Sequence, residues 1–219
     1  MLPRSLEPAE LRVLGSLIEK ELSTPDHYPL SLHALTSACN QSSNRDPVTT
    51  LDGATVSGAI DTLRRLGLMR SFQGIGERVP KYQHLMAEKS DLSRAELAVL
   101  CVLVLRGPQT LSEVRSRAAR LMPGDDPEGV EAALEALIAR DPGPAASRLP
   151  RRPGQKEVRY AHLLGGDIVY EDVGEEDTAV RTAVASTDRI AALENLTREL
   201  RLEMSDLRAQ FESFRKQFE

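Results

Sequence analysis

The chain has 219 residues and a formal charge of −5, so it lacks the overall basic footprint of most DNA-binding proteins and any such footprint must be local. It has no apolar run of membrane-spanning length and no signal-peptide pattern, so we expect a cytoplasmic protein without a membrane partner. Its two cysteines, Cys39 and Cys101, stand in apolar helical stretches, which predicts buried free thiols.

The first part of the chain predicts two helices. Apolar residues at helical spacing between Leu11 and Ile18 predict a helix that Pro8 begins and Thr24-Pro25-Asp26 ends. Ser31 can cap a short second helix, which ends before the polar segment Asn40–Pro47.

A third helix and a hairpin follow. Asp52 can cap a helix with Val56, Ile60 and Leu63 on its core face, and Gly67 is placed to close it in the left-handed conformation. Residues 68–72 and 79–85 predict two strands around a turn. Three helices followed by a hairpin is the order of a winged helix.

The same order returns in the second half. Helices are predicted near residues 93–105, 112–121 and 127–140, with Asp126-Pro127 as N-cap and first residue of the last one. A hairpin is predicted from about residue 146 to residue 163.

Three sequence echoes support this repetition. Leu6-x-x-Ala9-Glu10-Leu11 returns as Leu92-x-x-Ala95-Glu96-Leu97, Val56-x-x-Ala59-Ile60 as Val130-x-x-Ala133-Leu134, and Lys81-Tyr82-x-His84-Leu85 as Arg159-Tyr160-x-His162-Leu163. Three matches in one order indicate one unit used twice. We predict a mainly α fold with small β-hairpins (α+β), in which two tandem winged-helix domains precede a C-terminal coiled-coil helix. The predicted boundaries are residues 1–88 and 89–164 for the two domains, 165–178 for an acidic linker and 179–219 for the coiled coil.

The coiled-coil prediction depends on a heptad pattern of about five repeats. Facing pairs between parallel helices, Arg189 with Glu194 and Glu203 with Arg208, carry opposite charges and favour a parallel homodimer. A tail folded back on its own domains and another oligomeric state are the alternatives. The predicted oligomerisation residues are Ile190, Leu193, Leu200, Met204, Leu207, Phe211, Phe214 and Phe218.

Four segments carry a family resemblance. They are Val13-Leu14-Gly15-Ser16-Leu17-Ile18-Glu19-Lys20-Glu21, Tyr28-Pro29-Leu30-Ser31-Leu32, the stretch from Ala38 to Pro47, and Val79-Pro80-Lys81-Tyr82. Together they resemble the bacterial YceH family, which the second half matches mainly in layout. The resemblance implies a tandem winged-helix fold in a bacterial cytoplasmic protein, and it implies no established activity.

The third helix of a winged helix normally enters the DNA major groove, while the hairpin contacts the flanking backbone. In the first half, the face opposite the core holds Ala54, Gly58, Asp61, Thr62 and Arg65. The matching positions of the second half are Glu128, Ala132, Glu135, Ala136 and Ala139. Two carboxylates there would oppose a phosphate-lined groove, so the second face favours helix packing over base contact.

Polar and basic residues outside these faces complete the candidate interface. The segment Asn40–Pro47 is about twice the usual helix-turn-helix connection, and it either contacts a ligand or satisfies its own backbone. The second hairpin has a local excess of basic residues that suits phosphate contacts, although a solubilising loop has the same composition. The candidate nucleic-acid or partner contacts are Asn40, Gln41, Ser42, Asn44, Arg45, Arg65, Arg78, Lys81, Arg148, Arg151, Arg152 and Lys156, with Arg45 the first to mutate.

The residue pattern does not favour catalysis. His84 and His162 occupy equivalent repeat positions, which indicates a structural role. His27, His33 and Cys39 are six residues apart, so no two share a helical face at metal-ligand spacing. Phosphate-binding, nucleophile-elbow and dinucleotide motifs are absent from the sequence. We expect a non-enzyme without a metal or cofactor.

These observations predict a homodimeric, DNA-associated protein, such as a transcriptional regulator, whose contacts with duplex DNA are mainly electrostatic. The alternative is an adaptor whose winged helices hold a protein partner, as in accessory subunits of chromosome-organising complexes. That alternative is an analogy at the level of the fold, favoured by the acidic balance and by the alanine-glutamate face.

Overall fold

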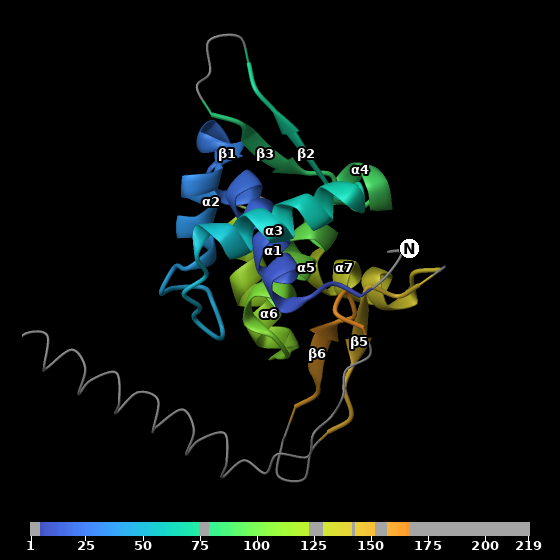
Figure 1. The fold of residues 1–219 in the computed structure, drawn as a ribbon. Coiled ribbons are helices and arrows are strands. Elements are labelled where there is room, and N and C mark those ends of the chain that lie inside the picture. Colours follow the sequence, from blue (N-terminus) through green and yellow to red (C-terminus); the bar gives the residue numbers. More distant parts are fainter. Residues whose placement is uncertain (1–4, 75–78, 123–128, 142, 152–156, 167–219) are drawn as a thin grey trace, which may run out of the picture. The chain divides into compact units, whose positions relative to one another are not determined.

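The computed structural model describes residues 5–74, 79–122, 129–141, 143–151 and 157–166 (Figure 1). The elements of the first half are α1 (Pro8–Ser23), the 3-10 helix η1 (Pro25–His27), β1 (Leu30–Ser31), α2 (Leu32–Cys39), α3 (Gly53–Arg65), β2 (Met69–Phe72) and β3 (Lys81–His84). A short helix α4 (Met86–Ser90) leads to the second half, which holds α5 (Arg94–Arg106), β4 (Gln109–Thr110), α6 (Leu111–Ala118), the 3-10 helix η2 (Ala119–Leu121), α7 (Gly129–Ala139), β5 (Ala146–Arg148) and β6 (Arg159–His162). The fold is therefore a mixture of helices and small antiparallel sheets.

Each half contains a three-stranded antiparallel sheet with the same order of strands. Strand β3 lies between β1 and β2, and β6 lies between β4 and β5. The registers also agree, because Leu30 pairs with Tyr82 in the first sheet and Gln109 pairs with Tyr160 in the second. The order helix, short strand, helix, helix and hairpin thus occurs twice.

Local capping explains where several helices begin and end. The side chains of Ser31 and Asp52 accept backbone hydrogen bonds at the starts of α2 and α3, as predicted. Ser93 and Thr110 take the same role in reciprocal capping boxes at α5 and α6. Gly67 follows α3 with a φ of 67°, the predicted left-handed closure.

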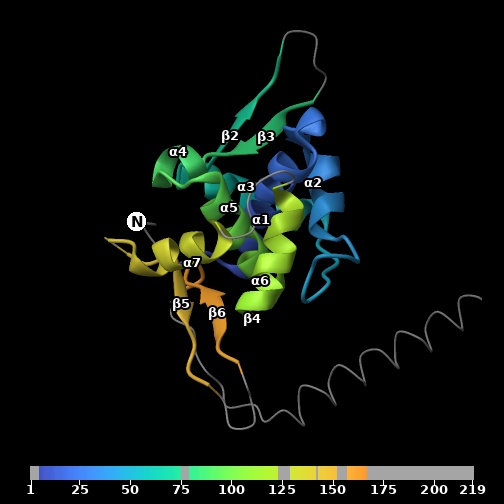
Figure 2. The same cartoon turned by 180° about the vertical axis from the view of Figure 1, so that it is seen from behind.

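The hydrophobic core is continuous between the halves because α1 and α5 pack against each other at its centre (Figure 2). These are equivalent helices of the repeat, and they meet at equivalent positions. The thiol of Cys101 donates to the carbonyl oxygen of Gly15, 86 positions earlier, over 3.4 Å. A Cβ atom at residue 15 would lie 2.9 Å from the side chains of Val104 and Leu105. Glycine is therefore what lets the two helices approach this closely.

Both cysteines are buried free thiols, as predicted. Burial raises the pKa of each thiol, because the charged thiolate loses its hydration. Cys39 and Cys101 therefore contribute to the core as small apolar side chains.

Some elements differ from the sequence-based expectation. The short strands β1 and β4 and the helix α4 were not predicted, and the predicted helix 112–121 is divided between α6 and η2. Asp126-Pro127 and the predicted coiled coil lie outside the described residues, as does all but the first part of the predicted acidic linker. Among the helices that the structure describes, no span is both long and apolar enough to cross a membrane.

Candidate nucleic-acid interface

The segment Asn40–Pro47 is anchored inward through Arg45. The Arg45 side chain is fully buried, and its Nη1 and Nη2 atoms donate to the two carboxylate oxygens of Glu19 at 3.0 and 2.6 Å. It also donates from Nε and Nη2 to the carbonyl oxygen of Ala38 and from Nη2 to Gln41. The structure thus places Arg45 inside the protein, and not on the contact surface that its polar surroundings in the sequence indicated.

The same segment connects the two halves. The backbone N–H of Asp46 donates to the carbonyl oxygen of Leu105 at 2.9 Å, and Nη1 of Arg106 donates to Oδ1 of Asn44 at 3.1 Å. Asn40 is occupied locally, because its amide exchanges two hydrogen bonds with the backbone of Leu51. Hydrogen bonds within the first half satisfy part of the polar groups of this segment. Its hydrogen bonds to Leu105 and Arg106 of α5 satisfy others. Of its predicted contact residues, Ser42 and Asn44 are exposed.

The predicted outer face of α3 points away from the core. Ala54, Gly58, Asp61 and Arg65 are exposed and Thr62 is half-buried, while Val56, Ile60 and Leu63 are buried. Arg65 donates to the hydroxyl of Thr62 at 2.9 Å, and Arg64 lies 3.7 Å from Asp61. Both arginines are in the last turn of α3, where positive side chains complement the helix dipole.

An open hollow of about 570 Å³ lies where α3 leads into β2. Three arginines line it, Arg64, Arg65 and Arg70, together with Asp61, Met69 and Ser71. Arg70 is 55% exposed, its Nη2 lies 3.9 Å from a carboxylate oxygen of Glu88, and its Nε and Nη2 donate to the side-chain oxygen of Gln83 at 2.9 and 2.7 Å. The hollow therefore has a net positive lining, and its guanidinium groups can supply several donors to phosphate oxygens. Lys81, on β3 of the same sheet, is half-buried.

The equivalent face of the second half is acidic and already paired. Ala132, Glu135, Ala136 and Ala139 are exposed on α7, whereas Glu128 lies outside the described residues. Arg148 donates to Glu135 at 3.0 Å and Arg115 donates to Glu131 at 2.7 Å. The face presents small apolar side chains flanked by ion pairs, an arrangement that favours packing over contact with phosphates.

In the described part of the second hairpin, Arg148 is already engaged by neighbouring side chains. Besides its pair with Glu135, the guanidinium of Arg148 lies 5.6 Å from the ring centre of Tyr160, and both neighbours raise the pKa of Arg148. Arg151 is exposed and borders an open hollow with Arg115 and Glu157. Arg78, Arg152 and Lys156 lie outside the described residues, as do all the predicted oligomerisation residues.

The two repeat histidines differ in their surroundings. His84 is buried, its Nδ1 accepts from the N–H of Met86, and its Nε2 contacts the carboxylate of Glu21. His162 has no such partner among the described residues, and burial lowers its pKa to about 4. Within the described part of the chain, no group of three His, Cys, Asp or Glu residues is arranged to hold a metal ion.

Sequence reasoning did not identify one cluster of arginines. Arg106, Arg117 and Arg120, together with Asn44 and Glu19, line a pocket between the halves. The arginines belong to α5, α6 and η2, so only the tertiary fold brings them together. Their basic charge was visible in the sequence, but no motif linked them to residues of the first half.

Residues 6–155 match the family described as "Protein of unknown function, DUF480". The chain is similar to UPF0502 proteins along nearly its whole length, with 49% identity over 217 residues to the protein of Pelobacter propionicus and 50% over 219 residues to that of Geobacter metallireducens. It is 47% identical over 216 residues to the UPF0502 protein of Solibacter usitatus. Each alignment covers 98% of both chains. These matches confirm an uncharacterised bacterial family, and the narrower YceH assignment stays a prediction.

Proposed function

The chain belongs to the bacterial family of unknown function DUF480, and we propose that it is a DNA-associated protein whose first half binds duplex DNA mainly through the phosphates. The helix and strand order supports the winged-helix part of this proposal. Each half has a short strand after its first helix and a terminal hairpin whose second strand is central. In a winged helix, that order places the third helix against the major groove and the hairpin against the backbone.

The arginine-lined hollow between α3 and β2 is the observation that carries the proposal. Arg65 and Arg70 face solvent from the helix and the hairpin, the two elements that flank bound DNA in this docking. Asp61 shares the face and weakens its positive potential. The contacts are therefore expected to position the duplex, with little discrimination between sequences.

Salt dependence of binding tests this function. Affinity for a random-sequence duplex is measured by fluorescence anisotropy at increasing salt. Three phosphate contacts predict a log–log slope of about −2 to −3, since each neutralised phosphate contributes about −0.9. Absence of binding at low salt contradicts the proposal, and so does binding that is independent of salt.

One observation favours a second candidate, a protein-interaction adaptor. The exposed Ala132, Ala136 and Ala139 give α7 a smooth face, and the ion pairs of Glu131 and Glu135 reduce its charge. A protein that stays bound after nuclease treatment and is lost in Glu135→Arg supports this role. If Glu135→Arg still retains the same partner, the partner does not bind to α7.

The proposed assembly is a non-enzymatic, cytoplasmic homodimer joined by a coiled coil over residues 179–219. The heptad pattern and its attractive flanking charges support this arrangement. Deletion of residues 173–219 should convert a dimer into a monomer in light scattering. If the truncated protein is still a dimer, the dimer interface lies within residues 1–172.

A further inference from the structure

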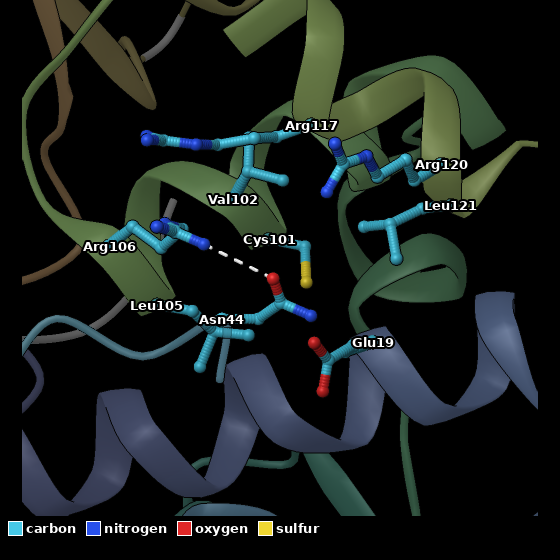
Figure 3. Close-up of a pocket in the computed structure, with 9 residues that line it drawn as sticks. All are labelled: Glu19, Asn44, Cys101, Val102, Leu105, Arg106, Arg117, Arg120 and Leu121. Atoms are coloured by element: carbon cyan, nitrogen blue, oxygen red, sulfur yellow. Dashed lines mark hydrogen bonds between the residues drawn. The ribbon is translucent and has the colours of Figure 1, made fainter. Parts of the chain in front are cut away.

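Three arginine side chains line the pocket between the halves (Figure 3). Figure 3 shows the side chains of Arg106, Arg117 and Arg120 at its edge, with Asn44 and Glu19 contributed by the first half. Its volume is about 40 Å³, roughly three times the space that one buried water needs. That volume suits a small tetrahedral oxyanion.

The acidic residue in the pocket does not balance these arginines. Both carboxylate oxygens of Glu19 already accept from the buried Arg45. Glu113, outside the pocket lining, pairs with Arg117 at 3.2 Å. Arg106 and Arg120 make no ion pair within the described part of the chain. Asp46 and Glu113 offset part of the charge of Arg106, and the pocket keeps a smaller excess of positive charge.

Arg106 also has unused hydrogen-bonding capacity. Its Nη1 donates to Asn44, but its buried Nε has no acceptor among the described residues. Burial lowers the pKa of Arg106, and repulsion from the Arg117 charge lowers it further. A buried donor without an acceptor and adjacent like charges are both costly, and an anion relieves both costs.

We propose that this pocket binds a phosphoryl group, either as free phosphate or as part of a nucleotide. Arg106 and Arg120 supply charge-assisted donors, while Arg117, whose two Nη atoms donate to Gln109 and Glu113, adds positive charge at the edge of the pocket. Asn44, which accepts a hydrogen bond from Arg106, belongs to the segment that precedes α3, so the site lies where the two halves meet. The site is separate from the hollow at α3 and does not depend on DNA binding.

Titration of the full-length chain with inorganic phosphate tests the site by calorimetry, with chloride at matched ionic strength as reference. Saturable phosphate binding is expected, and Arg120→Gln or Arg106→Gln should weaken it about tenfold, the loss of one charge-assisted contact. Arg115→Gln is the matched control, because Arg115 is exposed on α6 and pairs outside the pocket with Glu131. Circular dichroism checks that each variant is folded.

The outcomes distinguish the source of the phosphoryl group. A nucleoside triphosphate that binds much more tightly than phosphate, and needs Arg120, identifies a nucleotide ligand; equal or weaker binding identifies free phosphate. No response beyond that to chloride overturns the proposal, as does an equal loss in Arg115→Gln. The titration contains no duplex DNA and its variants leave α3 unchanged, so a failure of the DNA proposal leaves this result intact.

Discussion

The two halves share their helix order, strand order and register, but their third helices present different surfaces. Asp61 and Arg65 on α3 correspond in the repeat to Glu135 and Ala139 on α7. The first face borders a hollow with three arginines, whereas the second consists of alanines and glutamates already paired with arginines. Core positions maintain the architecture in both copies, while exposed positions carry no such constraint. The duplicated fold therefore does not imply a duplicated binding surface.

The largest expected effect concerns the buried Arg45–Glu19 pair, which has no counterpart among the described residues of the second half. Arg45→Met leaves the Glu19 carboxylate buried without its partner and should lower the free energy of unfolding by about 3–5 kcal/mol. Urea unfolding measures this loss. Restoration of most of the stability in the double variant Arg45→Met/Glu19→Gln separates the charge effect from lost packing. A single variant as stable as the wild type would show that the pair does not hold this segment.

The buried His162 should make the stability of the protein depend on pH. The folded pKa of His162 is about 4, below the ordinary value near 6.5, so the unfolded chain binds more protons between these values. The stabilisation from neutral His162 is complete above about pH 6.5, and roughly 3 kcal/mol of it is lost as the pH falls to about 4. His162→Gln should remove this contribution, and His84→Gln should retain it. Urea unfolding at both pH values measures the difference, and an unchanged pH dependence in His162→Gln refutes the assignment.

The crossing of α1 and α5 predicts a smaller effect. Gly15→Val places methyl groups against Val104 and Leu105 and should cost about 1–3 kcal/mol of stability. Gly58→Ala is the control, since no atom outside its own helix lies within 4 Å and the change should stabilise α3 slightly. Thermal unfolding compares the two variants. Equal stability of Gly15→Val and the wild type would mean that the helices can separate at this point without cost.

The smallest expected effect concerns the acidic residues at equivalent positions of α3 and α7, Asp61 and Glu135. Asp61→Asn frees Arg64 and should tighten duplex DNA binding by about two- to threefold at low salt. Glu135→Gln, the same change at the equivalent position, should leave the affinity unchanged. Anisotropy titrations of both variants provide the comparison, and an equal gain in both contradicts a DNA surface restricted to the first half.

Local chemistry explains which parts of the fold could be predicted from sequence. Ser31, Asp52 and Gly67 act on neighbouring backbone atoms, so their roles follow from positions close in the chain. The two-residue strands β1 and β4 were not predicted because they form only by pairing with β3 and β6, about 50 residues later.

The candidate site was harder to predict because its partners are distant in the chain. Arg45 lies in a polar stretch that resembles an exposed loop, but Glu19 and Ala38 provide buried acceptors. The anion pocket likewise needs Asn44 and Arg106, which are 62 residues apart. The outer faces of α3 and α7, in contrast, follow directly from helical spacing.

The most direct test of the central claim compares paired arginine variants of the two halves. The salt slope of duplex DNA binding is measured for Arg65→Gln/Arg70→Gln and for Arg148→Gln/Arg151→Gln. Loss of two phosphate contacts should reduce the slope of the first variant by about two units, with weaker binding at low salt, while the second variant behaves like the wild type. An unchanged slope in the first variant, or an equal reduction in both, contradicts the assignment of DNA binding to the first half.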